Sequence, residues 1–137
     1  MCSKCNGEGV VKDENGVWIK DCSCLLRPLK IYISGPMTGI EDFNYPKFDR
    51  IEKELKEQGF EVVNPASIGR ELVAREVIKD SMSDEIKTQV YMKHDLIGLL
   101  ECDSIFMMNG WMDSKGAFIE YNVALVTGHR FFYEELL

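Results

Sequence analysis

The sequence predicts an α/β protein with a doubly wound parallel sheet of the flavodoxin or Rossmann type, preceded by a small separate unit. From Lys30 onwards, short apolar strand patterns alternate with helix patterns over short connections, which favours a parallel sheet with helices on both faces. Before Lys30, four cysteines are crowded into a segment too short to bury a core of its own. We therefore predict two units, residues 1–28 and residues 29–137.

The first half of the α/β unit contains two predicted strands with a helix between them. The apolar run at 31–35 predicts the first strand, and the run at 60–65 predicts the second, which stops at Pro65. Between them, Asn44 and Pro46 are typical of a helix start. The apolar side chains of that helix recur at helical spacing: Phe48, Ile51 and Leu55.

The second half predicts helix, strand, helix and strand, at about 86–101, 104–108, 115–127 and 130–133. The strand at 104–108 is apolar on both faces, as a covered parallel sheet requires. Residues 66–90 fit this scheme poorly. Leu72, Val73 and Val77 are spaced to form a short helical segment, and the insertion as a whole is interpreted as a long loop or a lid near the ligand end of the sheet.

The N-terminal cysteines form two close pairs, Cys2-x-x-Cys5 and Cys22-x-Cys24. Two thiolate pairs separated by a hairpin-length insert, with its turn at 14–16, suit tetrahedral Zn²⁺. We predict a zinc-ribbon-like unit with a structural role, such as a clip or a docking element. A redox or disulfide pair is the alternative.

Composition narrows the range of partners. The formal net charge of −7 argues against nucleic acid as the main ligand, and no apolar run approaches the roughly 20 residues that cross a bilayer. No signal peptide is evident, so the protein is expected in the cytoplasm. Neither GxGxxG nor a P-loop is present, and no organic cofactor is expected.

Polar groups follow two of the predicted strands, where ligands bind in an open parallel sheet. The first strand runs into the loop 34–39, and the third runs into Asn109, Gly110 and a turn that ends at Ser114. Ser114 begins the next helix, as an ordinary N-cap or as part of an anion site. Glu120 lies on the apolar side of that helix, facing the sheet, where an unpaired carboxylate is costly.

These segments carry a resemblance to a known family. The stretches IYISGPMTG, DFNYPKFD, GFEVVNPA and HDLIGLLECDSIFMMNGWMDSKGAFIEYNVA, in this order, resemble the nucleoside 2-deoxyribosyltransferase superfamily, and most of all its short branch common in phage genomes. The resemblance covers roughly residues 30–133. In place of the family's tighter glycine-rich context, Phe118 and Tyr121 flank the glutamate here.

The resemblance implies roles for particular residues. Glu120 matches the glutamate that attacks the anomeric carbon, Asp103 matches an aspartate that assists base protonation, and Ser114 matches a phosphate-binding serine. The full set of expected substrate-binding residues is Tyr32, Ser34, Gly35, Met37, Gly39, Gly110, Ser114 and Gly116. The resemblance also implies a homo-oligomer.

The leading functional prediction is an enzyme that cleaves the N-glycosyl bond of a deoxynucleoside 5′-monophosphate or a close relative. Two other classes of function stay open. The first alternative is a non-catalytic nucleotide-binding sensor or sponge, and the second is an adaptor whose zinc unit docks to a partner.

Overall fold

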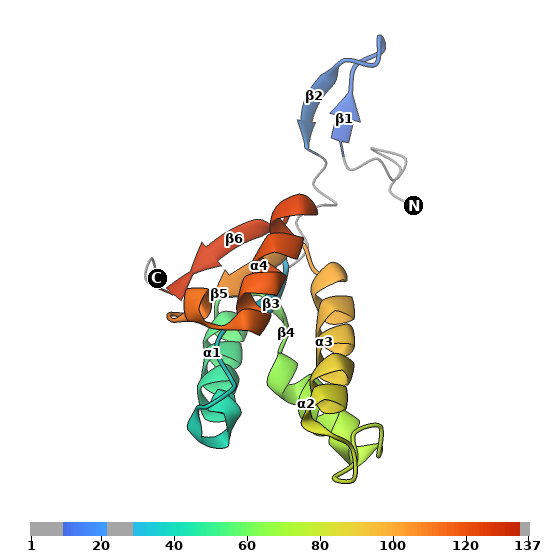
Figure 1. The fold of residues 1–137 in the computed structure, drawn as a ribbon. Helices are drawn as coiled ribbons and strands as arrows, with labels where there is room; N and C mark the ends of the chain where they lie inside the picture. Colours follow the sequence, from blue (N-terminus) through green and yellow to red (C-terminus); the bar gives the residue numbers. More distant parts are fainter. Residues whose placement is uncertain (1–9, 22–28, 135–137) are drawn as a thin grey trace.

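The computed structural model describes residues 10–21 and 29–134. Its main part is a four-stranded, fully parallel sheet in the order β4-β3-β5-β6 (Figure 1). The strands are β3 (Lys30–Ser34), β4 (Glu61–Val63), β5 (Ser104–Met107) and β6 (Arg130–Tyr133). Because β4 and β5 lie on opposite sides of β3, the winding reverses beside β3, which is where doubly wound sheets bind ligands.

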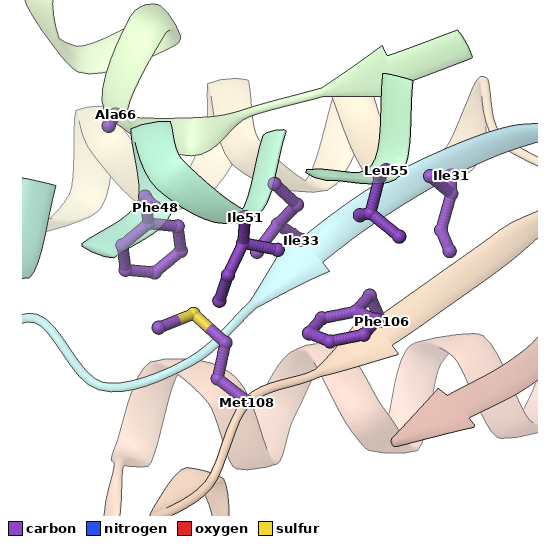
Figure 2. Close-up of a cluster of buried hydrophobic side chains, with 8 residues drawn as sticks. All are labelled: Ile31, Ile33, Phe48, Ile51, Leu55, Ala66, Phe106 and Met108. Atoms are coloured by element: carbon purple, nitrogen blue, oxygen red, sulfur yellow. The ribbon is translucent and has the colours of Figure 1, made fainter. Parts of the chain in front are cut away.

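Helices cover both faces of this sheet, as predicted. Alternate residues of a strand point to opposite faces. Ile31, Ile33, Phe106 and Met108 therefore face helix α1 (Tyr45–Glu57), which contributes Phe48, Ile51 and Leu55 to the same buried cluster (Figure 2). The other face carries Tyr32, Ile105 and Met107, and is covered by helices α3 (Asp84–Leu100) and α4 (Lys115–Val126). Both clusters flank the central strands β3 and β5.

Helix α1 starts where the sequence predicts it, but its first turn is not capped by the Asn44 side chain. Asn44 is the N-cap residue, yet its side chain makes no capping hydrogen bond and instead donates to the carbonyl oxygen of Pro36 at 3.0 Å. Asp42, Phe43 and Asn44 all have positive φ, in the short 3-10 helix η2 (Glu41–Asn44). Consecutive left-handed residues without glycine are uncommon, and the hydrogen bond from Asn44 to Pro36 ties this segment to the loop after β3.

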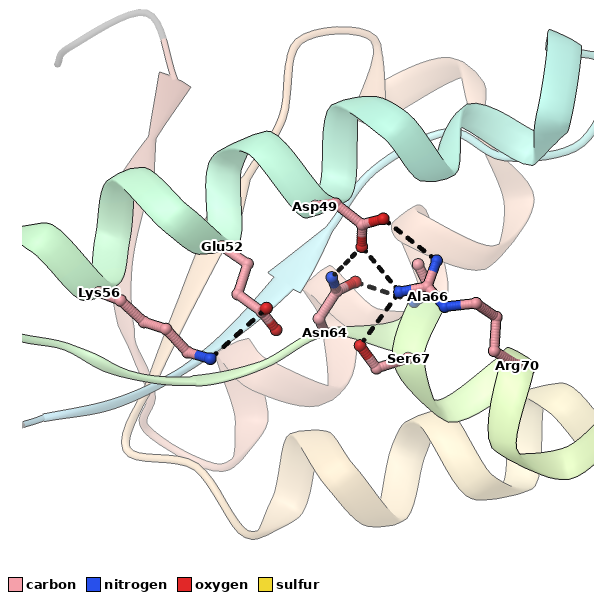
Figure 3. Close-up of polar contacts among 7 residues, drawn as sticks. All are labelled: Asp49, Glu52, Lys56, Asn64, Ala66, Ser67 and Arg70. Atoms are coloured by element: carbon pink, nitrogen blue, oxygen red, sulfur yellow. Dashed lines mark hydrogen bonds and ion pairs between the residues drawn. The ribbon is translucent and has the colours of Figure 1, made fainter. Parts of the chain in front are cut away.

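The prediction of a loop or lid at residues 66–90 is wrong for its first part. Helix α2 (Pro65–Ala74) begins directly after β4, with Asn64 as its N-cap accepting a hydrogen bond from the Ala66 N–H at 2.9 Å. Pro65 therefore starts a helix, in the position where its missing N–H costs nothing. Arg70 forms a two-pronged ion pair with Asp49, which ties α2 to α1 (Figure 3).

The N-terminal part described is a β-hairpin, as predicted. Strands β1 (Val10–Lys12) and β2 (Trp18–Asp21) pair antiparallel. The Asp13 carboxylate accepts hydrogen bonds from the N–H groups of Asn15 and Val17, and Gly16 has the positive φ that this tight turn needs. In the part of the chain that the structure describes, no helix is both long and apolar enough to cross a membrane.

Candidate functional site

Glu120 belongs to α4, and its side chain is buried between this helix and the carboxyl end of β3. Its side chain is 5% exposed and accepts hydrogen bonds at both carboxylate oxygens, from the Tyr32 hydroxyl and, at 2.8 Å, from the Ser34 hydroxyl. Among the described residues, no Lys, Arg or His forms an ion pair with it. Hydroxyl groups alone therefore compensate for removing this carboxylate from water, an arrangement more typical of a functional site than of a structural ion pair.

A second carboxylic acid, which sequence reasoning missed, lies close to Glu120. Asp95 extends from α3, and its Oδ1 atom is buried without a hydrogen-bond partner. An unsatisfied buried carboxyl oxygen is rare in native proteins. The sequence did contain the signal, since Asp95 lies between Met92 and Leu99 on the helix face that packs on the sheet. We name Tyr32, Ser34, Asp95 and Glu120 the carboxylate cluster.

Burial and mutual charge shift the protonation of this cluster. Burial raises the pKa of Glu120 to about 7, while the hydrogen bonds from Tyr32 and Ser34 oppose the rise. Burial and then the negative charge of Glu120 raise the pKa of Asp95 to about 8. Burial and the same charge raise the pKa of Tyr32 well above its usual range, so its hydroxyl stays a donor. Near neutral pH Asp95 therefore holds its proton more firmly than Glu120 does.

Strand alternation and one glycine bring these four side chains together. Tyr32 and Ser34 are two residues apart on β3, so both point to the face that α3 and α4 cover. A Cβ on Gly98 of α3 would lie 3.1 Å from side-chain carbons of Ile68 and Val63, so glycine lets α3 pack this closely without displacing them. Asp95 lies one turn earlier on α3, near enough to Tyr32 of β3 and to Glu120 for their charges to interact.

The structure places the other predicted site residues at the same edge of the sheet, in varied roles. The Ser114 hydroxyl caps α4 by accepting from the Ala117 N–H at 3.2 Å, which confirms the N-cap interpretation and leaves its own hydrogen free to donate. Packing requires a glycine at position 35, because a Cβ there would lie 2.6 Å from the Met108 sulfur.

The remaining four predicted residues show no ligand-facing feature. Met37 packs against the core on the α1 side, and Gly116 lies against the Met92 methyl group. Gly39 and Gly110 are exposed turn residues with positive φ. Their place in the site rests on the sequence alone.

Asp103 does not lie in the carboxylate cluster, which corrects its predicted partnership with Glu120. It precedes β5, level with Lys30, whose carbonyl accepts the Asp103 N–H and whose own N–H donates to the Asp103 carboxylate. Ser34 lies four residues further along β3, roughly 13 Å away at the usual rise per strand residue. Asp103 thus links the start of β5 to the start of β3 by hydrogen bonds, at the amino edge of the sheet. Glu120 lies at the opposite edge.

Comparison with known families assigns the α/β unit. Residues 29–133 match the model of the family described as a domain of unknown function, DUF4406. The chain belongs to the DUF4406 family. Comparison with curated proteins gives no match. The DUF4406 domain includes the whole carboxylate cluster, whereas the cysteine pairs precede it.

The four cysteines ahead of the DUF4406 domain, Cys2, Cys5, Cys22 and Cys24, lie outside the described residues. Across residues 10–21 and 29–134, no group of three or more His, Cys, Asp or Glu side chains is arranged to hold a metal ion. The predicted zinc site thus stays a prediction, and the hairpin between the two cysteine pairs is the part of it that the structure describes.

The zinc prediction is tested by elemental analysis. Purified protein should carry about one Zn²⁺ per chain, and changing all four N-terminal cysteines to serine should abolish it, since thiolates are the ligands. Cys102→Ala is the matched control, because this buried thiol donates to the Gly98 carbonyl and should not affect zinc content. Protein that contains no zinc, or keeps it in the four-serine variant, would refute the site.

Proposed function

We propose that this protein cleaves the N-glycosyl bond of a 2-deoxynucleotide, with Glu120 as nucleophile and Asp95 as the acid that protonates the departing base. The observation that carries the proposal is the pair of buried carboxyl groups with raised pKa values at the carboxyl edge of the sheet. Two carboxyl groups that differ in protonation at neutral pH are the minimum for displacement with acid assistance. The sequence resemblance to the nucleoside 2-deoxyribosyltransferase superfamily supplies the substrate class.

In the first step, a carboxylate oxygen of Glu120 bonds to the anomeric carbon of the sugar while the bond from that carbon to the base nitrogen breaks. The electron pair of the broken bond stays with the base, which takes the proton from Asp95. In the second step, water or another base attacks the anomeric carbon, the ester to Glu120 breaks, and Asp95 accepts the proton released by the attacking group. Tyr32 and Ser34 hold the Glu120 carboxylate in place through both steps.

The second candidate is a protein that binds nucleotides without turnover. It is favoured by the hydrogen bonding of Glu120, since both of its carboxylate oxygens already accept a hydroxyl and such bonds reduce nucleophilicity. Binding alone would still use the cluster to recognise a sugar or a base.

One experiment separates these two functions. The protein is incubated with a panel of deoxynucleosides, deoxynucleoside 5′-monophosphates and their ribose counterparts, and free base is quantified by chromatography. Binding of the same panel is measured by calorimetry. We expect base release from at least one deoxynucleotide. Binding without release would favour the second candidate, and neither binding nor release would contradict both.

The place of the phosphate gives a further prediction. If the N-terminus of α4 holds a 5′-phosphate, Ser114→Ala should weaken binding of the monophosphate by about ten- to a hundredfold, the cost of one hydrogen bond to a charged group. The matching nucleoside should bind as before, as measured by calorimetry.

Ser83→Ala is the matched control for this change. Ser83 caps α3 as Ser114 caps α4, by accepting from the Ile86 N–H at 3.2 Å. Each substitution should lower the free energy of unfolding by about 1 kcal/mol through the lost cap, but only Ser114→Ala should affect the nucleotide. Equal affinity of the wild type for nucleoside and monophosphate would rule out the phosphate role.

A further inference from the structure

Ser34 is the last residue of β3, and both its backbone and its side chain are fixed. The residue is fully buried, and its hydroxyl donates to the Glu120 Oε1 atom at 2.8 Å. Its backbone pairs with Met107 of β5, and its carbonyl oxygen accepts the Met108 N–H at 2.8 Å. Because the sheet holds this backbone, the hydroxyl can leave Glu120 only by rotating about χ1, which breaks its hydrogen bond.

The hydrogen bonds to Glu120 occupy a lone pair on each carboxylate oxygen. An ionised carboxylate has about four acceptor positions, two on each oxygen. Oε2 accepts the Tyr32 hydroxyl, and Oε1 accepts the Ser34 hydroxyl. Ser34 lies closer than Tyr32 to the carboxyl end of β3, where a ligand binds, so Oε1 lies on the ligand side. Once Oε1 attacks a sugar with its second lone pair, it has no position left for another donor.

The stereochemistry of a nucleotide decides what lies beside the attacking oxygen. In a β-nucleotide the base leaves from one face of the sugar, and an in-line nucleophile attacks the anomeric carbon from the opposite face. The 2′-hydroxyl of ribose projects from that opposite face, on the neighbouring carbon. It would lie about one hydrogen-bond length from the attacking oxygen, and the Ser34 hydroxyl already occupies that distance, at 2.8 Å. A 2-deoxy sugar carries only hydrogen there.

We propose that Ser34 excludes ribonucleotides by occupying the position on Glu120 that a 2′-hydroxyl needs. This inference rests on the proposed function, in which Glu120 is the nucleophile. A ribonucleotide in the site would bury a 2′-hydroxyl whose nearest acceptor has no lone pair to offer, and an unpaired buried hydroxyl weakens binding. Ser34 is thus a specificity-determining residue that makes the site selective for 2-deoxy sugars.

The inference is tested by the kcat/KM of base release from pairs of deoxy- and ribonucleoside 5′-monophosphates that share adenine, guanine, cytosine or uracil. Ser34→Ala should reduce the deoxy preference of the wild type by about ten- to a hundredfold, the effect of one hydrogen bond to a charged group. Release from the deoxynucleotide should slow, because Oε1 loses its donor. In the ribonucleotide, the 2′-hydroxyl replaces that donor.

Ser104→Ala is the matched control. Ser104 is also a fully buried serine of the central strands, and its hydroxyl has no hydrogen-bond partner in the part of the chain that the structure describes. It pairs with Ile31, near the amino end of β3, away from the carboxylate cluster. Its loss should leave the deoxy preference unchanged.

A second comparison uses the unchanged protein and so does not depend on how Ser34→Ala folds. An arabinonucleotide carries its 2′-hydroxyl on the same face as the base, away from Glu120, and is otherwise identical to the ribonucleotide. The wild type should therefore release base from the arabinonucleotide with a kcat/KM at least about tenfold higher than from the ribonucleotide.

The outcomes separate this inference from the proposed function. Base release with equal kcat/KM for deoxy and ribose sugars, a preference that survives Ser34→Ala, or an arabinonucleotide no better than the ribonucleotide would overturn the inference alone. So would a larger loss on the ribonucleotide than on the deoxynucleotide in Ser34→Ala, since Ser34 would then bind the 2′-hydroxyl. If no base is released, the proposed function fails and calorimetric affinities decide the inference. Equal affinity for the two sugars, or no binding at all, overturns it.

Discussion

Glu120→Gln should reduce base release at least about a thousandfold, as expected when a covalent catalyst loses its nucleophile. The amide keeps the shape of the side chain and can still accept a hydrogen bond, but it does not attack an anomeric carbon. Nucleotide affinity should persist, because the amide lacks the negative charge that repels a phosphate. Initial rates of base release and calorimetric affinity, measured on the same preparation, check both expectations.

Glu54→Gln is the control for this substitution, because Glu54 is an exposed glutamate on α1, remote from the carboxylate cluster. It should release base at the wild-type rate. Wild-type activity in Glu120→Gln would mean that Glu120 is not the nucleophile. A fall in affinity equal to the fall in rate would indicate instead that Glu120 contributes mainly to binding.

Asp95→Asn should have the second largest effect on activity. Loss of a proton donor typically costs about a hundred- to ten-thousandfold, and the loss should depend on the leaving group. A 2-deoxyriboside that releases nitrophenolate needs no proton, so its hydrolysis should be far less affected than that of a purine or pyrimidine nucleotide. The wild-type pH–rate profile should be bell-shaped with its maximum between about pH 7 and 8, since Glu120 must be ionised and Asp95 protonated.

In Asp95→Asn the alkaline limb of that profile should disappear. Asp103→Asn provides the comparison, because Asp103 lies at the opposite edge of the sheet and should influence stability more than the shape of the profile. A profile that loses its alkaline limb in Asp103→Asn, but not in Asp95→Asn, would reverse the assignment of the acid.

The same raised pKa values make stability depend on pH. Folding raises the pKa of Asp95 from its usual value near 4 to about 8, so the folded protein holds this proton more tightly than the unfolded chain. The stabilisation is complete below about pH 4 and is lost as pH rises towards 8. Asp95→Asn should therefore raise the free energy of unfolding at pH 8 to 9, by on the order of 1–3 kcal/mol. Urea unfolding of both proteins from pH 5 to 9 would show the difference widening with pH.

The sequence predicts the sheet and most helices because strand alternation and helical spacing are local signals. The apolar residues at 31–35 and 104–108 place both central strands, and the serine before α4 places its start. The start of helix α2 was missed, although Leu72 and Val73 indicated a helical segment, because Pro65 is compatible with the end of a strand and with the first turn of a helix. Only the Asn64 side chain, by capping that turn, decides between the two.

The candidate site was predicted in part. Glu120 was identified because a carboxylate on an apolar helix side is conspicuous, and its contacts with Tyr32 and Ser34 follow from strand alternation. Asp95 presents the same signal, but α3 also carries polar residues on its flanks, so the buried side is less distinct in the sequence. Asp103 was assigned by motif, although a residue that precedes a parallel strand lies at the amino edge, away from the usual ligand site.

The most direct test of the proposed mechanism is mass spectrometry of the acid-quenched protein during turnover of a deoxynucleotide. A glycosyl-enzyme mechanism predicts that the intact mass of the chain increases by the sugar phosphate, that peptide mapping locates the adduct on Glu120, and that Glu120→Gln shows no adduct. Steady base release with no adduct on the wild type, or an adduct on another residue, would contradict the assignment of Glu120 as the nucleophile.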